Sequence, residues 1–193
     1  MTHVWKRFCL AVLCLSASAL VAQEPWDTSF NLVVGSFSGA EDAQIGQDHN
    51  YAISMAGAYP LSRRGSVAFD LGYRVFPTTT VHPSTHAYLD YKTDGFYASA
   101  LYRHQLWLDG IYVQGGLRAS RYKDALDSIS NDDGSRVTLK GSPEFSVKPI
   151  LGLGYRFTAK LSLEVNAAPL SVQNVAGQTK SGTLVEVALG IHL

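Results

Sequence analysis

Cysteine is nearly absent from this chain, and both cysteines fall in one short N-terminal stretch. The 193 residues contain only Cys9 and Cys14. If that stretch is removed as a leader, the remainder has no disulfide and no thiolate metal ligand. The same absence excludes catalysis by a cysteine nucleophile.

The N-terminal stretch has the features of a secretory signal peptide. Lys6 and Arg7 precede an apolar run from Phe8 to Ala22 that ends in small residues. This run is shorter than the roughly twenty residues that a membrane-spanning helix requires. We therefore expect residues 1–22 to be a cleaved signal peptide and residues 23–193 to form one domain.

An excess of charge of either sign is also lacking. Without the leader the chain has 14 basic and 16 acidic residues, a net charge of −2. Nucleic-acid-binding domains carry a basic patch or stripe. We therefore expect no nucleic-acid partner.

A helical period is missing after the leader, and a period of two takes its place. Phe96, Ala98 and Ala100, for example, alternate with Tyr97 and Ser99. Successive side chains of a strand point to opposite faces, so this alternation predicts strands with one apolar and one polar face. Such stretches occur at residues 26–36, 51–59, 67–76, 95–106, 111–122, 145–157, 161–172 and 183–193.

The connections between these stretches alternate in length. Residues 61–65, 107–110 and 158–160 form short connections, whereas residues 37–49, 77–94, 123–142 and 173–182 form long polar ones. Short turns at one end and long loops at the other are typical of bacterial outer-membrane barrels. We predict an all-β fold, an eight-stranded antiparallel up-and-down transmembrane β-barrel in the cell outer membrane. Its termini are expected in the periplasm and its long loops outside the cell.

Aromatic residues near the strand ends indicate which face lies outside. Two rings of aromatic side chains flanking an apolar band are expected where a barrel crosses the bilayer interfaces. A water-soluble barrel of the lipocalin kind would place its apolar face inside, and it is the less favoured alternative. The two expected rings consist of Trp26, Tyr59, Trp107, Tyr155 and Phe157 near the short turns, and Tyr51, Phe76, Phe96, Tyr122 and Phe145 near the long loops.

With its alternating strands, short turns and terminal run VEVALGIHL, the chain resembles the small eight-stranded outer-membrane barrels of the outer membrane protein A and X type. The resemblance is architectural and extends over the chain after the leader. It implies insertion by the barrel-assembly machinery and contact with outer-membrane lipids and lipopolysaccharide. That family usually ends in an aromatic residue that the machinery recognises, whereas this chain ends in Leu193. A monomer without a cofactor is expected.

Charged residues recur on the polar face of the predicted strands. The interior of an eight-stranded barrel is just wide enough for side chains, and an unpaired buried charge is costly. We therefore predict a lumen filled by paired charges, not an ion pathway or a catalytic site. The expected lumen charge network is Asp70, Arg74, Arg103, Arg118, Lys148, Arg156, Glu164 and Glu186. Counting along the strands predicts that Arg156 and Glu164 are lumen neighbours near the periplasmic end and that Asp70 pairs with Arg103.

One long loop has residue types found in hydrolases and metal sites. His82, Ser84 and His86 lie within five residues of each other. A serine beside a histidine and a carboxylate can be activated for acyl transfer, and two histidines can bind a metal. Lipid A deacylases of this fold carry His-x-Ser on a strand near the C-terminus, where residues 164–168 here contain no histidine. The three residues are therefore weak candidates, and no metal site is expected.

These observations favour a structural or surface-interaction role, exerted through long extracellular loops that contact an unknown ligand. Two alternatives stay open: a lipid A-modifying acyl hydrolase or transferase of the same fold, and a narrow channel for small or hydrophobic solutes. Convergent serine, histidine and carboxylate groups at a rim would favour the enzyme. A continuous lumen or a lateral opening between strands would favour transport. Enzymatic activity is the less favoured of these readings of the sequence.

Overall fold

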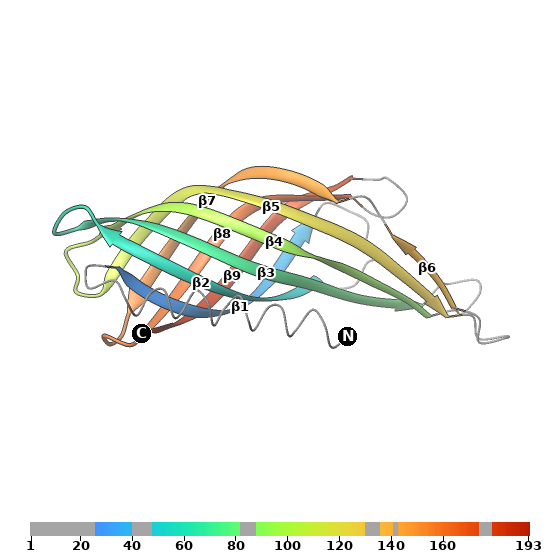
Figure 1. Cartoon of the computed structure of the whole chain (residues 1–193), viewed down its shortest axis with the longest axis horizontal. Helices are drawn as coiled ribbons and strands as arrows, with labels where there is room; N and C mark the ends of the chain where they lie inside the picture. Colours follow the sequence, from blue (N-terminus) through green and yellow to red (C-terminus); the bar gives the residue numbers. More distant parts are fainter. Residues whose placement is uncertain (1–25, 40–47, 82–87, 130–135, 141–142, 174–178) are drawn as a thin grey trace.

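The strands of the protein form one closed antiparallel barrel (Figure 1). The computed structural model describes residues 26–39, 48–81, 88–129, 136–140, 143–173 and 179–193. No helix in these ranges is long and apolar enough to cross a membrane. The strands are β1 (Asp27–Gly39), β2 (Asp48–Pro60), β3 (Gly65–Val81), β4 (Tyr88–Gln105), β5 (Ile111–Ile129), β6 (Arg136–Lys140), β7 (Glu144–Arg156), β8 (Leu161–Gln173) and β9 (Thr179–His192).

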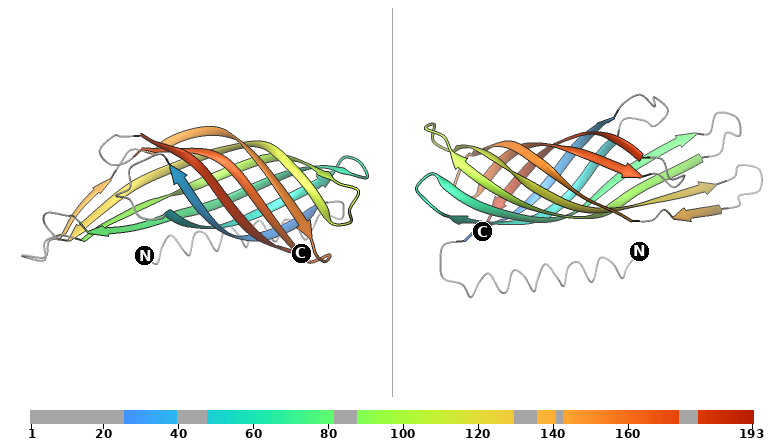
Figure 2. Two further views of the ribbon diagram at one scale, coloured as in Figure 1. Left: turned by 180° about the vertical axis from the view of Figure 1, so that it is seen from behind. Right: turned by 90° about the horizontal axis from the view of Figure 1, so that it is seen from above.

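Closure follows from the order in which neighbouring strands pair. The sheet runs β4-β3-β2-β1-β9-β8-β7-β5, and a further pairing of β4 with β5 closes the ring. The short β6 pairs with β5 and extends one wall. The predicted eight-stranded antiparallel barrel is therefore confirmed, and Figure 2 shows the strong tilt of its strands.

The alternation seen in the sequence sorts side chains between the two faces of the wall. On β9, Val187 and Leu189 are exposed outside, while Glu186 and Ala188 are buried inside. An exposed apolar belt suits hydrocarbon, and the closed sheet pairs backbone groups that lipid cannot hydrate. The outward face of the barrel is therefore built for a bilayer.

Two residues assigned to the outer aromatic ring lie inside the barrel instead. Phe76 and Tyr122 are buried, and their rings meet edge to face with centroids 5.6 Å apart. The reason is parity: Phe76 is two residues from the inward Arg74, and Tyr122 is four from the inward Arg118. The other eight predicted ring residues have side chains outside or in turns, with Phe145 and Trp107 the most exposed of them.

The expected loops 77–94 and 123–142 are largely strand. The pairing of β3 with β4 continues to Val81–Tyr88, and that of β4 with β5 to Tyr88–Ile129. These strands continue past the end of the apolar alternation through backbone hydrogen bonds alone. Once the register is set within the barrel, the pairing can extend beyond it without apolar side chains. The hydrophobic pattern therefore reports the length of the apolar band and not that of the strands.

The described short connections all lie at one end of the barrel, which also holds the C-terminus (Figure 1). We call this the short-turn end and the opposite one the long-loop end. In the turn before β5, Gly110 has a φ of 83°, a conformation that glycine adopts without steric cost. The turn before β3 is closed by the Leu61 N–H, which donates to the Gly65 carbonyl at 2.8 Å.

Closure between the first and last strands is testable with a disulfide, because the chain after the predicted leader has no cysteine. Val33 and Ala188 are register partners, and they lie between hydrogen-bonded pairs, where cross-strand Cβ atoms come closest. We expect Val33→Cys with Ala188→Cys to form a disulfide that changes mobility on a non-reducing gel. Val33→Cys with Leu189→Cys, on opposite faces, is the control. Equal cross-linking of both variants would contradict the register.

Candidate functional site

The polar interior consists of three groups of side chains stacked along the barrel. We call them the mouth cluster, at the short-turn end, the lower network above it, and the central network above both. The mouth cluster is Asp27, Arg156, Ser162 and His192. The lower network is Arg103, Tyr112, Gln114, Glu164 and Asn166, and the central network is Asp70, Arg74, Tyr97, Ser99, Arg118 and Glu186.

The central network is organised by Glu186 of β9. Arg118 of β5 donates two hydrogen bonds of 2.8 Å to its two carboxylate oxygens, and Arg74 of β3 donates another. Neither β3 nor β5 neighbours β9, so these ion pairs cross the lumen. The three side chains are at most 6% exposed. At such burial, removing one charge leaves its partner buried and uncompensated, which strongly destabilises the fold.

Tyr97 fills the space between the two arginines. The guanidinium carbons of Arg118 and Arg74 lie 4.4 and 5.1 Å from the centre of its ring. A Cβ atom on Gly72 of the adjoining strand would clash with this ring. Gly72 therefore makes room for Tyr97, and the tyrosine holds the cations by their attraction to its ring face.

The lower network is built in the same way around Glu164 of β8. Arg103 and Tyr112 donate hydrogen bonds to one carboxylate oxygen at 2.8 and 2.7 Å, and the Gln114 amide donates to the other at 2.8 Å. The same amide donates to Asn166 at 2.7 Å, and Arg103 donates to the Gln114 carbonyl at 2.8 Å. Two strands on one wall thus bind an acid on the opposite wall.

The mouth cluster joins the first and last strands of the barrel. Arg156 of β7 donates to Asp27 of β1 at 2.6 and 3.3 Å. His192 of β9 contacts Asp27 through Nδ1 at 2.8 Å and Ser162 of β8 through Nε2 at 2.9 Å. Serine, histidine and aspartate are thereby linked in the order that a nucleophile, its base and an orienting carboxylate require.

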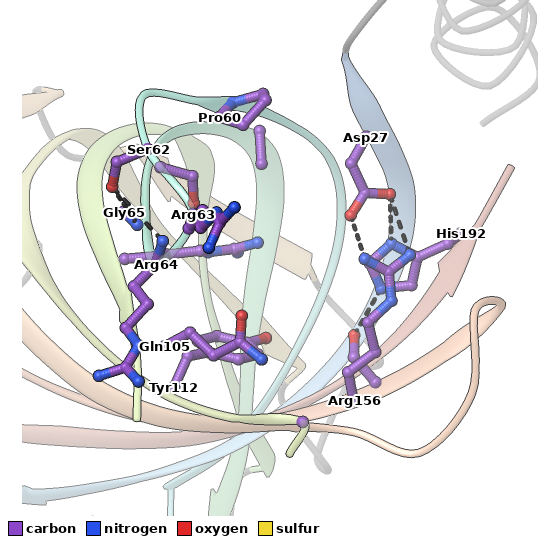
Figure 3. A pocket seen from close by; sticks show the side chains of 15 residues that line it. Asp27, Pro60, Ser62, Arg63, Arg64, Gly65, Gln105, Tyr112, Arg156 and His192 are labelled. Carbon is purple, nitrogen blue, oxygen red and sulfur yellow. Dashed lines mark hydrogen bonds and ion pairs between the residues drawn. The ribbon is translucent and has the colours of Figure 1, made fainter. Parts of the chain in front are cut away.

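This cluster lines an open pocket of about 330 Å³ at the short-turn end. Figure 3 shows Asp27, Arg156 and His192 together on one side, with Arg63 and Arg64 on the other. Arg103 lines the pocket as well. Several arginines against one aspartate make the pocket suited to a negatively charged ligand.

The structure brings most of the predicted lumen residues together, all of them on the inward face. Asp70 lies 3.9 Å from Arg118, at the edge of the central network. Lys148 sits on β7 opposite Arg118, but it makes no ion pair with a carboxylate in the described part of the chain. Arg74, Arg103, Arg118, Arg156, Glu164 and Glu186 all form ion pairs.

Arg156 and Glu164 are diagonal neighbours on the inward face of β7 and β8, as predicted, but they form no ion pair with each other. The predicted pair of Asp70 with Arg103 is not formed. Arg156 pairs with Asp27 and not with Glu164, and Arg103 pairs with Glu164 and not with Asp70. On adjoining strands Asp70 stands opposite Ser99, four residues from Arg103, which is about 13 Å along a strand. Long side chains reach across the lumen instead of to the next strand.

The hydrolase-like candidates of the long loop cannot be compared with the mouth cluster, three of whose residues the sequence analysis did not single out. His82, Ser84 and His86 lie outside the described residues. The missed residues are Asp27, Ser162 and His192, which lie far apart in the sequence. Their signal was present: each has inward parity and lies within two residues of the short-turn end of its strand. In the described ranges no three potential ligands are grouped to hold a metal ion.

Comparison with known proteins identifies the fold. No protein-family model and no curated sequence matches the chain. Neisserial surface protein A (NspA) is similar in structure, with a TM-score of 0.56 and 15% identity over 87% of this chain and 96% of that one. Ail, the attachment invasion locus protein of Yersinia pestis, solved with the heparin analogue sucrose octasulfate, has a TM-score of 0.51 and 13% identity over 87% of this chain and 97% of that one. The chain thus has the fold of small eight-stranded outer-membrane barrels.

Removing Glu186 tests the central network. We expect Glu186→Ala to lower the free energy of unfolding by about 3–5 kcal/mol, because two buried guanidinium groups lose their partner. Urea titration of the purified barrel in detergent, followed by gel mobility without heating, measures this change. Asp109→Asn, in an exposed turn, is the control and should change stability by less than about 0.5 kcal/mol. Equal midpoints for the two variants would show that the network is dispensable.

Proposed function

We propose that this protein is an integral outer-membrane barrel with a structural or surface-interaction role and a lumen closed to ions. The observation that carries the proposal is the set of ion pairs that cross the lumen at three levels. Eight strands enclose little more than their inward side chains, and here those side chains bind one another. The short-turn end faces the periplasm and the long-loop end the outside, as in barrels of this architecture.

The outer rim of β5 supports contact with lipopolysaccharide. Arg121 and Lys123 are exposed on the outward face of β5, and Arg121 is the register partner of the exposed Phe96. Cations beside an interfacial aromatic residue suit the phosphate groups of lipid head groups. Assembly by the barrel-assembly machinery, a monomeric state and an extracellular ligand held by the long loops belong to the same proposal.

Conductance tests whether the lumen is closed. We expect the purified protein to give no large, steady single-channel currents in a planar bilayer. Replacing Arg103, Arg118 and Arg156 by alanine should raise the conductance and lower the melting temperature, because the side chains that span the lumen are removed. The control is Lys160→Ala, in an exposed turn that lies outside the networks and does not line the pocket. Large steady currents from the unaltered protein would overturn the proposal and support a channel.

A second candidate function is acyl-ester hydrolysis in the mouth cluster, and it rests on the Ser162–His192–Asp27 contacts. In this reaction Ser162 Oγ attacks the ester carbonyl while His192 Nε2 takes the hydroxyl proton, and Asp27 stabilises the resulting imidazolium. The ester C–O bond then breaks, and His192 protonates the departing alcohol. Water, deprotonated by His192, hydrolyses the acyl-serine and releases the acid.

The position of this cluster changes the expected substrate. Ser162 is 2% exposed, so the carbonyl must reach it through the pocket, and the pocket arginines favour an ester that carries a negative charge. The pocket opens at the short-turn end. An ester reached from the periplasm therefore fits better than lipid A, which lies in the outer leaflet.

Hydrolysis of p-nitrophenyl butyrate separates the two candidates. If the mouth cluster is catalytic, Ser162→Ala should lower kcat/KM at least about 100-fold, and the unaltered protein should be labelled at Ser162 by a fluorophosphonate. Ser66→Ala, which changes another serine of the pocket, is the matched control. If the unaltered protein is no more active than Ser162→Ala and is not labelled, the catalytic proposal is wrong. The Ser162–His192–Asp27 contacts would then serve only to hold the two ends of the chain together.

A further inference from the structure

The barrel wall is incompletely paired between β7 and β8. Their register runs from Arg156–Ser162 at the short-turn end only to Leu151–Ala167. Beyond that point each strand stays paired with its other neighbour, β7 with β5 as far as Glu144 and β8 with β9 as far as Gln173. The two strands therefore remain in the sheet while the ladder between them stops partway up the wall.

Two prolines stand where the ladder stops. Continuing the register by two residues places Pro149 opposite Pro169. The Phe157 N–H donates to the Leu161 carbonyl at 3.0 Å, and hydrogen-bonded pairs recur at every second position of an antiparallel ladder. By this count, Leu151–Ala167 and then Pro149–Pro169 are positions that exchange two N–H···O bonds. Neither proline has an N–H to donate, so both bonds are lost.

Neither proline disturbs the other side of its strand. The Arg156 N–H donates to the Gly110 carbonyl, and the His192 N–H to the Lys160 carbonyl. The same alternation places even-numbered residues of β7 in bonds to β5, and even-numbered residues of β8 in bonds to β9. The missing donors of Pro149 and Pro169 therefore face only each other, as prolines do at a sheet edge.

The interruption lies at the level of the hydrocarbon. Pro149 is eight residues from Phe157, which for a tilted strand is about 20 Å above the short-turn end, within an apolar band of about 25 Å. The exposed side chains around it are Leu151, Val147 and Phe145. With the short turns in the periplasm, this is the outer leaflet.

On the long-loop side of the central network an apolar cluster lies in the interior, together with the inward polar residues Lys148, Ser146 and Glu144 of β7. Phe37, Phe76, Tyr122, Leu170 and Leu184 form one buried cluster. This cluster lies nearer the long-loop end than the charged residues of the same strands. Phe76 is nearer that end than Arg74 on β3, and Leu184 is nearer it than Glu186 on β9. Leu170 belongs to β8 itself, directly after Pro169. The central network lies below this cluster and separates it from the mouth.

We propose that β7 and β8 part at Pro149 and Pro169, and that one acyl chain of an outer-leaflet lipid enters the barrel there and lies against this apolar cluster. Lys148 completes the site. Its side chain points inward beside Pro149, has no carboxylate partner among the described residues, and is long enough to reach a negatively charged head group. The site does not open the lumen to ions, because the central network stays intact beneath it.

Lipids with a spin label on one acyl chain test this site. In nanodiscs doped with doxyl-labelled phosphatidylglycerol, we expect the methyl NMR signals of the inward Leu170 and Leu184 to be broadened about as strongly as those of the outward Leu151. Pro149→Ala with Pro169→Ala restores both donors and should remove the broadening inside while leaving that of Leu151. Pro60→Ala, at the end of β2, is the matched control. Unbroadened inner methyl groups in the unaltered protein, or broadening that survives the double substitution, would overturn the proposal.

The role of Lys148 has its own comparison. Doxyl-labelled phosphatidylglycerol should broaden the inner signals more than doxyl-labelled phosphatidylcholine, and Lys148→Gln should abolish that difference. An equal effect of both lipids on the unaltered protein would remove Lys148 from the site. Conductance is read separately, so a failed lipid test leaves the closed lumen as it stands.

Discussion

Pairing of charges across the lumen is the constraint on which the interior depends. The carboxylates of Asp27, Glu164 and Glu186 come from β1, β8 and β9, which form one wall, and the arginines that bind them come from β3, β4, β5 and β7. Each acid on its own would be a buried charge, and so would each arginine. Only a closed barrel brings the two walls within reach of one another. Closure and charge satisfaction are therefore the same event, and a barrel that failed to close would leave both walls with unpaired charges.

The small residues of the wall follow from this crossing. Long side chains need room where they meet the opposite strands, and the inward glycines provide it: Tyr97 occupies the space over Gly72, and Tyr112 that over Gly154. Glycine-rich strands, taken alone, suggest an open pore. In this barrel each of these gaps is filled by an aromatic ring that also contacts a guanidinium group. A glycine on one strand thus leaves room for an aromatic side chain of the neighbouring strand.

The sequence was sufficient for the fold and for the face on which each charge lies, because strand parity is a local property. It was insufficient for the partners. Arg103 meets Glu164, 61 residues away, because the stagger of the strands aims its side chain across the lumen, and stagger is a property of the closed ring. Asp27 and His192 meet for the same reason, since only the pairing of β1 with β9 joins the chain ends. Phe76 and Tyr122 show the opposite error: their parity was readable, but their aromatic character suggested an interface.

The central network also divides the interior into two compartments of different chemistry. Toward the short turns lies a polar pocket with arginines and the Ser162–His192–Asp27 contacts. Toward the long loops lies the apolar cluster, beside a wall whose ladder stops at two prolines. Losing two hydrogen bonds in hydrocarbon is costly. Glu186 and its two arginines bridge the lumen between these two regions. The lipid binding proposed at the wall and the hydrolysis proposed at the mouth therefore involve different residues, and each can be tested without the other.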